Sequence, residues 1–73
     1  MLSKILSDCI KNMINENRPK AQALAIKAMC MANKMKEKEI LNEANAVFDL
    51  EPVKSKKEFI SLMIWQAREL IQD

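Results

Sequence analysis

The stretch PKAQALAIKAMCMANKM, from Pro19 to Met35, decides the fold of this 73-residue chain. When it is drawn as a helix, Lys20, Lys27 and Lys34 fall on one narrow edge, and almost all the other positions are apolar. A helix that is apolar nearly all round must be covered on several sides. The stretch therefore predicts the central helix of a small all-α domain.

Length and composition indicate one folded domain, residues 1–73. The chain is 49% apolar and 30% charged, which is the balance of a folded soluble protein rather than a disordered one. Its size is near the limit at which one core suffices, which favours association with a second copy. No apolar run approaches the roughly 18 residues of a membrane span, and the N-terminus lacks a signal-peptide cleavage site. We therefore expect no membrane insertion and a cytoplasmic location.

The residue types that usually carry catalysis are missing, since the chain has no His, Tyr, Thr or Gly. Neither glycine-rich phosphate loops nor the usual proton-transfer and nucleophile groups can be assembled without them. Cys9 and Cys30 are not in a metal-binding spacing. We expect both to be buried and reduced, with a single disulfide as the alternative. The prediction is a protein that is not an enzyme, with no catalytic residues, no metal and no cofactor.

A first helix precedes the central one. Its apolar residues recur at helical spacing: Leu2, Ile5, Leu6, Cys9, Ile10, Met13 and Ile14. Pro19 disfavours a helical conformation at Arg18 and suits the first turn of the next helix, so Asn17 or Arg18 is the expected boundary. The central helix is predicted to reach Met35 and to be followed by a tight turn near 36–38. A single helix over 19–50 is the alternative.

Two further helices are predicted. The third covers roughly 38–50, from apolar residues at helical spacing: Ile40, Leu41, Ala44, Val47 and Phe48. It ends at Glu51, because the residue before Pro52 is pushed out of the helical region. Ser55 and Glu58 match a capping box, so the fourth helix should run from Lys56 to about Gln72. The expected fold is a small all-α bundle of four helices arranged as two α-hairpins.

The segment MANKMKEKEILNEANAVFDL, from Met31 to Leu50, resembles the junction between successive tetratricopeptide repeats. In that family a helix with small residues meets a charged turn and then an Ala-bearing helix. The resemblance places Ala32, Met35, Ala44 and Phe48 at the small and large packing positions. It departs from the family in lacking the turn Gly and the aromatic of the first repeat helix, and repeat arrays normally contain three or more repeats. It implies a protein-binding module and assigns no ligand-binding residue.

Basic residues form two rows with a spacing of seven. The rows, each expected along one helix edge, are Lys4, Lys11 and Arg18, and Lys20, Lys27 and Lys34. Residues 1–38 carry a net charge of +5 and residues 39–73 carry −3, which sum to the overall +2. Such a surface is suited to an acidic partner, a nucleic acid or the acidic half of a second copy. A solvated face is the simpler interpretation, because the overall charge is low and no aromatic platform accompanies the lysines.

The only Trp of the chain, Trp65, is predicted to lie outside the core. On the fourth helix the expected core face comprises Phe59, Ile60, Met63, Ile64, Ala67, Leu70 and Ile71. Trp65 falls on the polar side with Leu62 beside it and Arg68 nearby. Because aromatic anchors are enriched at interface centres, Trp65, Leu62 and Arg68 are the predicted protein-binding residues. The alternative is that Trp65 is covered by another helix or lies flat under Arg68.

These observations favour a small cytoplasmic adaptor or regulator that binds a protein partner, and also itself, with defined stoichiometry. A phage-encoded accessory or inhibitor protein fits the size and composition. The alternative is a small nucleic-acid-binding or transcription-regulating domain that uses the lysine-rich edge. Affinity that falls steeply with salt would favour that alternative.

Overall fold

The computed structural model describes residues 1–49 and 51–71, and of Ile71 the backbone only. Its helices, in chain order, are α1 (Leu2–Ile14), α2 (Arg18–Asn33), α3 (Glu37–Asn45) and α4 (Lys56–Ile71). Within the described ranges there is no strand, so the all-α prediction is confirmed. The helix ends predicted at Leu50 and Gln72 lie outside these ranges.

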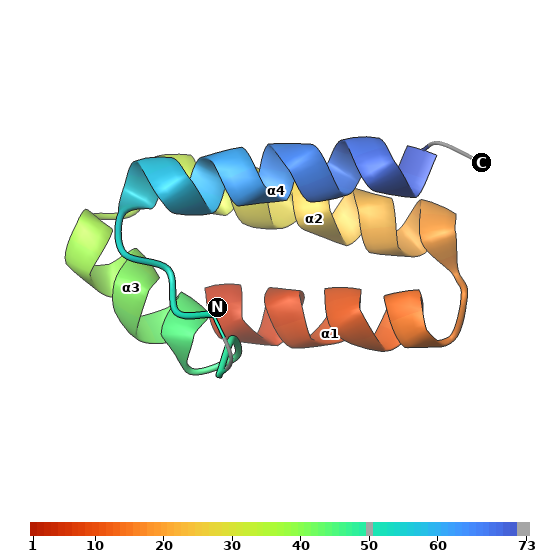
Figure 1. Ribbon diagram of the computed structural model, residues 1–73, viewed down its shortest axis with the longest axis horizontal. Coiled ribbons are helices and arrows are strands. Elements are labelled where there is room, and N and C mark those ends of the chain that lie inside the picture. Colours follow the sequence, from red (N-terminus) through yellow and green to blue (C-terminus); the bar gives the residue numbers. More distant parts are fainter. Residues whose placement is uncertain (50, 72–73) are drawn as a thin grey trace.

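Helix α2 is the central element of the bundle (Figure 1). It packs along α1 on one side and along α4 on the other, while α3 contacts α1 and α4 at one end. Between the described residues of α1 and α4 there is at most marginal contact. The central position predicted for this helix is therefore confirmed.

Small side chains on α2 allow both neighbours to approach. Its buried residues are all alanines: Ala21, Ala25, Ala28 and Ala32. The opposite side, which we call the outer face of α2, carries Ala23, Ile26 and Cys30, all exposed. Because, in the described part of the chain, only α1 and α4 cover α2, this apolar face is exposed to water. The prediction that Cys30 is buried is therefore wrong. Cys9 is buried as expected, and its thiol donates a hydrogen bond to the carbonyl of Ala21 at 3.2 Å.

The core is thick at one end of the bundle and thin at the other. The filled end, next to α3, buries Leu2, Ile5, Leu6, Ala28, Ala32, Ile40, Ala44, Val53, Phe59 and Met63. The thin end, next to the α1–α2 turn, buries Cys9, Ala21, Ala25 and Ala67. Here Met13 and Ile14, predicted to belong to the core, are exposed, Ile14 by 75%. The last turn of α1 lies at the opposite end of the bundle from α3 (Figure 1).

The α1–α2 turn closes without a glycine. The amide of Asn17 donates to the carbonyl of Asn12 at 2.8 Å, and the amide of Glu16 donates to Met13 at 3.1 Å. These bonds form a Schellman motif, which requires a left-handed residue that is usually Gly. Glu16 occupies that position with φ 61°. Asn17 is the residue before α2, so the predicted boundary is confirmed.

The α2–α3 turn excludes the single long helix. Lys36 has extended backbone angles, φ −76° and ψ 149°, directly before α3. The ammonium of Lys56 donates to the carbonyls of Asn33 (3.1 Å) and Met35 (2.9 Å). A cation that bonds the final carbonyls of a helix stabilises its C-terminus. Asn33 is the last residue of α2 and Met35 lies in the turn, so the first residue of α4 bonds both the end of α2 and the turn that follows it.

Helix α3 ends at Asn45, earlier than predicted, because the Asn45 side chain binds the chain that returns toward α4. Its Oδ1 accepts from the Val53 amide at 2.7 Å and its Nδ2 donates to the Val53 carbonyl at 3.1 Å. Val47 and Phe48 consequently lie in a loop rather than on a helix.

The predicted capping box at the start of α4 is present in part. The Ser55 hydroxyl accepts from the Glu58 amide at 3.1 Å, as expected. In a capping box the Glu58 carboxylate would accept from the backbone amide of Ser55. Here it accepts from the backbone amide of Lys54, one residue earlier, at 3.3 Å.

Candidate protein-binding groove

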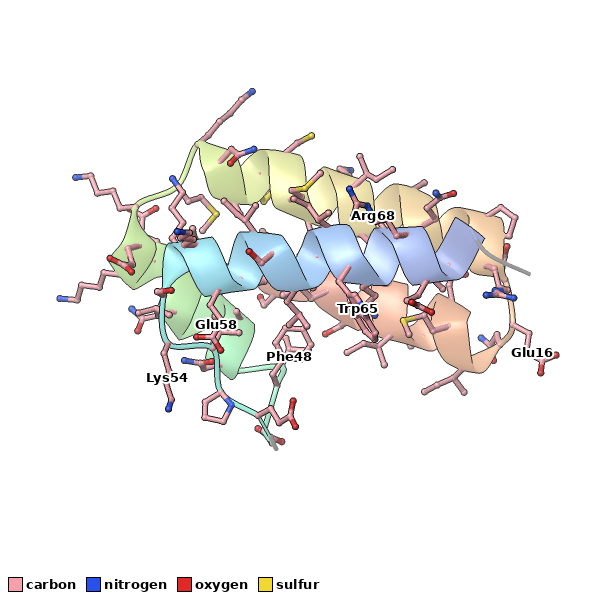
Figure 2. The ribbon with its side chains drawn as sticks, turned by 45° about the horizontal axis from the view of Figure 1, so that its top comes forward. Glu16, Phe48, Lys54, Glu58, Trp65 and Arg68 are labelled. Atoms are coloured by element: carbon pink, nitrogen blue, oxygen red, sulfur yellow. The ribbon has the colours of Figure 1, made fainter. Side chains whose placement is uncertain are left out.

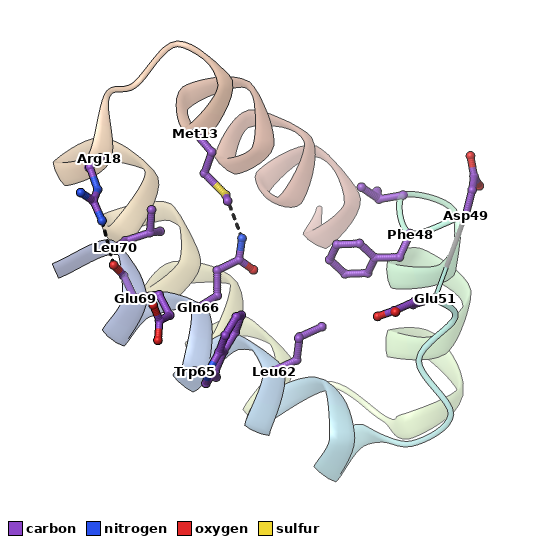
Figure 3. Close-up of a pocket in the computed structure, with 11 residues that line it drawn as sticks. Met13, Arg18, Phe48, Asp49, Glu51, Leu62, Trp65, Gln66, Glu69 and Leu70 are labelled. Carbon is purple, nitrogen blue, oxygen red and sulfur yellow. Dashed lines mark hydrogen bonds between the residues drawn. The ribbon is translucent and has the colours of Figure 1, made fainter. Parts of the chain in front are cut away.

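A groove of about 810 Å³ lies between α4 on one side and, on the other, the last turn of α1 and the loop after α3 (Figure 3). Its volume is within the range of sites that hold a small molecule or a set of partner side chains. We call it the open groove, and it is lined by Met13, Arg18, Val47, Phe48, Asp49, Glu51, Leu62, Trp65, Gln66, Glu69 and Leu70. It exists because α1 and α4 both pack on α2 but hardly on each other.

Trp65 stands at the edge of this groove with 60% of its surface exposed. Leu62, one turn earlier on α4, is half-buried, and so is Phe48, which enters from the loop after α3. The expectation that Trp65 lies outside the core beside Leu62 is therefore confirmed in position. The two side chains join an aromatic residue from another part of the chain on one surface.

Arg68 does not join them. It is absent from the groove lining, and in Figure 2 it leaves α4 on the side near α2, whereas Trp65 leaves it on the side near α1. Ile64, predicted for the core face, is 38% exposed. The buried face of α4 is thus rotated toward Leu62, because the neighbouring helices decide which flank is covered.

Two contacts close the thin end of the groove. The guanidinium of Arg18 donates to the carbonyl of Glu69 at 2.9 Å, and the amide of Gln66 donates to the sulfur of Met13 at 2.8 Å. Arg18 belongs to the first turn of α2 and lines the groove. The prediction that Lys4, Lys11 and Arg18 lie along one helix edge is wrong, because α1 ends at Ile14, before Arg18.

The charged residues of the groove are mainly acidic. Asp49 and Glu51 lie at the loop end, and Glu69 lies beside Arg18 at the other end (Figure 3). The remaining basic residues predicted as a face are all exposed, and none of them lines the groove: Lys4, Lys11, Lys20, Lys27 and Lys34. The lysines and the groove are therefore separate surfaces.

Sequence reasoning missed Phe48 and Met13 as groove residues. Both were assigned to core faces, since each follows the helical spacing of its neighbours. No local signal marks where α3 stops, so Phe48 could not be separated from the helix. Met13 is exposed because α3 does not reach the end of α1, and this depends on packing between helices that local sequence patterns do not encode.

Burial raises the pKa of the Cys9 thiol, which keeps it protonated. Among the described residues, no three His, Cys, Asp or Glu side chains are grouped so that they could hold a metal ion. None of the helices, as far as they are described, has the length and apolarity to cross a membrane.

Comparison of the chain with models of protein families, with curated proteins and with solved structures finds no match. The tetratricopeptide resemblance of residues 31–50 therefore stays a prediction.

Proposed function

We propose that this chain is a small protein-binding adaptor or regulator that acts in the cytoplasm by stoichiometric association, with the open groove as its binding surface. The observation that carries the proposal is the exposure of Trp65, 60%, at a groove that also contains Phe48 and Leu62. Clustered aromatic and aliphatic side chains at a concave surface are typical of interface hot spots. A small domain that leaves its largest apolar side chain in water forgoes burial that would stabilise it.

The acidic groups of the groove favour a protein partner over a nucleic acid. Asp49, Glu51 and Glu69 would repel phosphates, which supply most of the affinity in nucleic-acid binding. The alternative nucleic-acid surface would have to use Lys20, Lys27 and other lysines outside the groove. Helix α2 supplies no aromatic side chain on which a base could stack.

The test is selection from a displayed library of random peptides with the wild-type protein and a groove variant, Phe48→Ala with Trp65→Ala. Ile26→Ala is the matched control, because Ile26 is an exposed apolar residue on the outer face of α2. Circular dichroism and thermal melting establish that each variant is folded.

We expect peptides enriched by the wild type to bind the control equally well and the groove variant at least about 30-fold more weakly, as loss of an aromatic hot spot implies. Equal binding to the folded groove variant would contradict the proposal. Binding lost in Ile26→Ala but kept in the groove variant would move the site to α2.

A further inference from the structure

We infer that the open groove receives an amphipathic α-helix from a partner protein, with large apolar residues on the stripe that enters and Lys or Arg residues beside it. This inference rests on the proposed function, which assigns protein binding to the groove without specifying the partner. It names the secondary structure, the spacing of the anchors and the charge.

The arrangement of the helices leaves a place for one more. Helices α1 and α4 run in the same direction, both antiparallel to α2 (Figure 1). The lining of the open groove includes Met13 at the end of α1 and five residues of α4. A fourth long helix laid between α1 and α4 would form a four-helix bundle with α1, α2 and α4. Helix α3 fills this position only near the filled end, where it contacts both α1 and α4.

The length of the groove matches a short helical motif. From Leu62 to Leu70, the part of α4 that lines it spans about 12 Å at 1.5 Å per residue. A helix docked over this whole length would have to displace the hydrogen bond from Gln66 to the sulfur of Met13. Anchors at positions i, i+3 or i+4, and i+7 of a docked helix span about 10 Å. A peptide that binds by strand addition would need a strand edge, and the described part of this chain has no strand.

The charge of the groove indicates which residues should lie beside the apolar stripe of the docked helix. Of its four charged lining residues, three are acidic, and Arg18 is held by the carbonyl of Glu69 at 2.9 Å. At the loop end, the Glu51 carboxylate points toward the groove near Phe48, and the Asp49 carboxylate points outward from the same loop (Figure 3). Basic residues on the partner would therefore meet complementary potential, which fixes orientation and speeds association.

A second copy of this chain is the weaker candidate. The outer face of α2 has the required basic flank, but its exposed apolar residues are Ala23, Ile26 and Cys30, of which only Ile26 is large. Docking that face into the groove of another copy would also be a heterologous contact, which closes into a ring or continues without end. One large side chain cannot fill a groove of about 810 Å³.

The experiment uses three synthetic helical peptides without Trp. The first has Leu at i, i+3, i+4 and i+7 and Lys on both flanks, the second replaces every Lys by Glu, and the third shuffles the composition of the first to destroy the stripe. Because Trp65 is the only Trp, its fluorescence reports binding at the groove directly. The charge variant is Asp49→Lys with Glu51→Lys, and Glu39→Lys, exposed on α3 and outside the groove, is the control.

We expect the Lys peptide to bind at least about 10-fold more tightly than the Glu and shuffled peptides. The charge variant should reverse the preference between Lys and Glu, and the control should keep it.

Equal affinity for the Lys and Glu peptides would overturn the inferred charge while leaving the groove as a protein-binding site. Equal affinity for the shuffled peptide, or no change of Trp65 fluorescence with any of the three, would overturn the helical occupant. A stable oligomer in sedimentation that Trp65→Ala dissociates would assign the groove to a second copy. Failure of the proposed function itself appears separately, in the library selection.

Discussion

The two ends of this bundle are built from different side chains, although the pattern of α1 is the same along its length. At the filled end, Leu2 and Leu6 are enclosed together with Phe59 and other large residues. At the thin end the buried residues are Cys9 and three alanines, and Ile14 lies in water. The difference shows that the apolar face of α1 is buried only where α3 packs against it in addition to α2. Where α3 is absent, at the thin end, Met13 of α1 lines the open groove instead.

The largest expected difference in stability is between substitutions of Met63 and Trp65, which lie two residues apart on α4. Met63 is 1% exposed at the filled end, so Met63→Ala should lower the free energy of unfolding by about 2 to 5 kcal/mol. Trp65→Ala should lower it by about 0.5 kcal/mol, as for surface substitutions. Urea unfolding monitored by circular dichroism measures both. If Trp65→Ala proves as costly as Met63→Ala, Trp65 belongs to the core and the groove is no binding site.

The next effect tests the close packing of α2. Ala28→Leu adds bulk where α2 is fully buried, so it should cost about 1 to 3 kcal/mol of stability. Ala23→Leu is the matched control, because Ala23 lies on the exposed outer face of the same helix. The two melting temperatures should differ by about 4 to 8 °C for each kcal/mol. Equal melting temperatures would mean that alanines do not set the spacing of α1, α2 and α4.

A smaller effect, in the stabilising direction, is expected at the α1–α2 turn. Glu16 has φ 61°, where a Cβ atom is strained and Gly is not. Glu16→Gly should raise the free energy of unfolding by roughly 0.5 to 1 kcal/mol. Glu16→Ala removes the same charge but keeps the Cβ atom, so it should have little effect. A thermal melt in which Ala stabilises as much as Gly would attribute the gain to charge instead of backbone strain.

The mildest test changes no residue and compares the two thiols. Cys9 is buried at the thin end, where desolvation raises its pKa, so at pH 7.5 it holds even less reactive thiolate than a free cysteine. Cys30 is exposed on the outer face of α2. Maleimide should therefore label Cys30 promptly and Cys9 only after unfolding in urea, as followed by mass spectrometry. Equal rates in the folded protein would show that the thin end opens readily.

Much of the fold could be predicted from local patterns in the sequence. Pro19 marked the start of α2, and Ser55 with Glu58 marked the start of α4, because proline geometry and capping act within a few residues. The central position of α2 followed from its apolar composition. The prediction was wrong for Cys30, because α2 is covered on two sides only.

The residues that α4 contributes to the candidate site could be predicted in part, and the residue from the loop could not. Trp65 and Leu62 were identified because their positions on α4 differ from its apolar stripe, whereas Arg68 was placed with them and lies apart. Phe48 was missed, since its loop position is set by the hydrogen bonds of Asn45 to Val53, and no spacing rule encodes a contact across a loop. Long-range contacts of this kind also fixed the rotation of α4.

The paired hydrogen bonds between Asn45 and Val53 have a consequence for affinity. Together they join the residues on either side of the segment that carries Phe48, the aromatic residue that the loop contributes to the groove. If the loop were released, a ligand would bind only the fraction of molecules with Phe48 in place, and its apparent dissociation constant would rise by the inverse of that fraction. Asn45 would then tune recognition through a conformational equilibrium without touching the ligand.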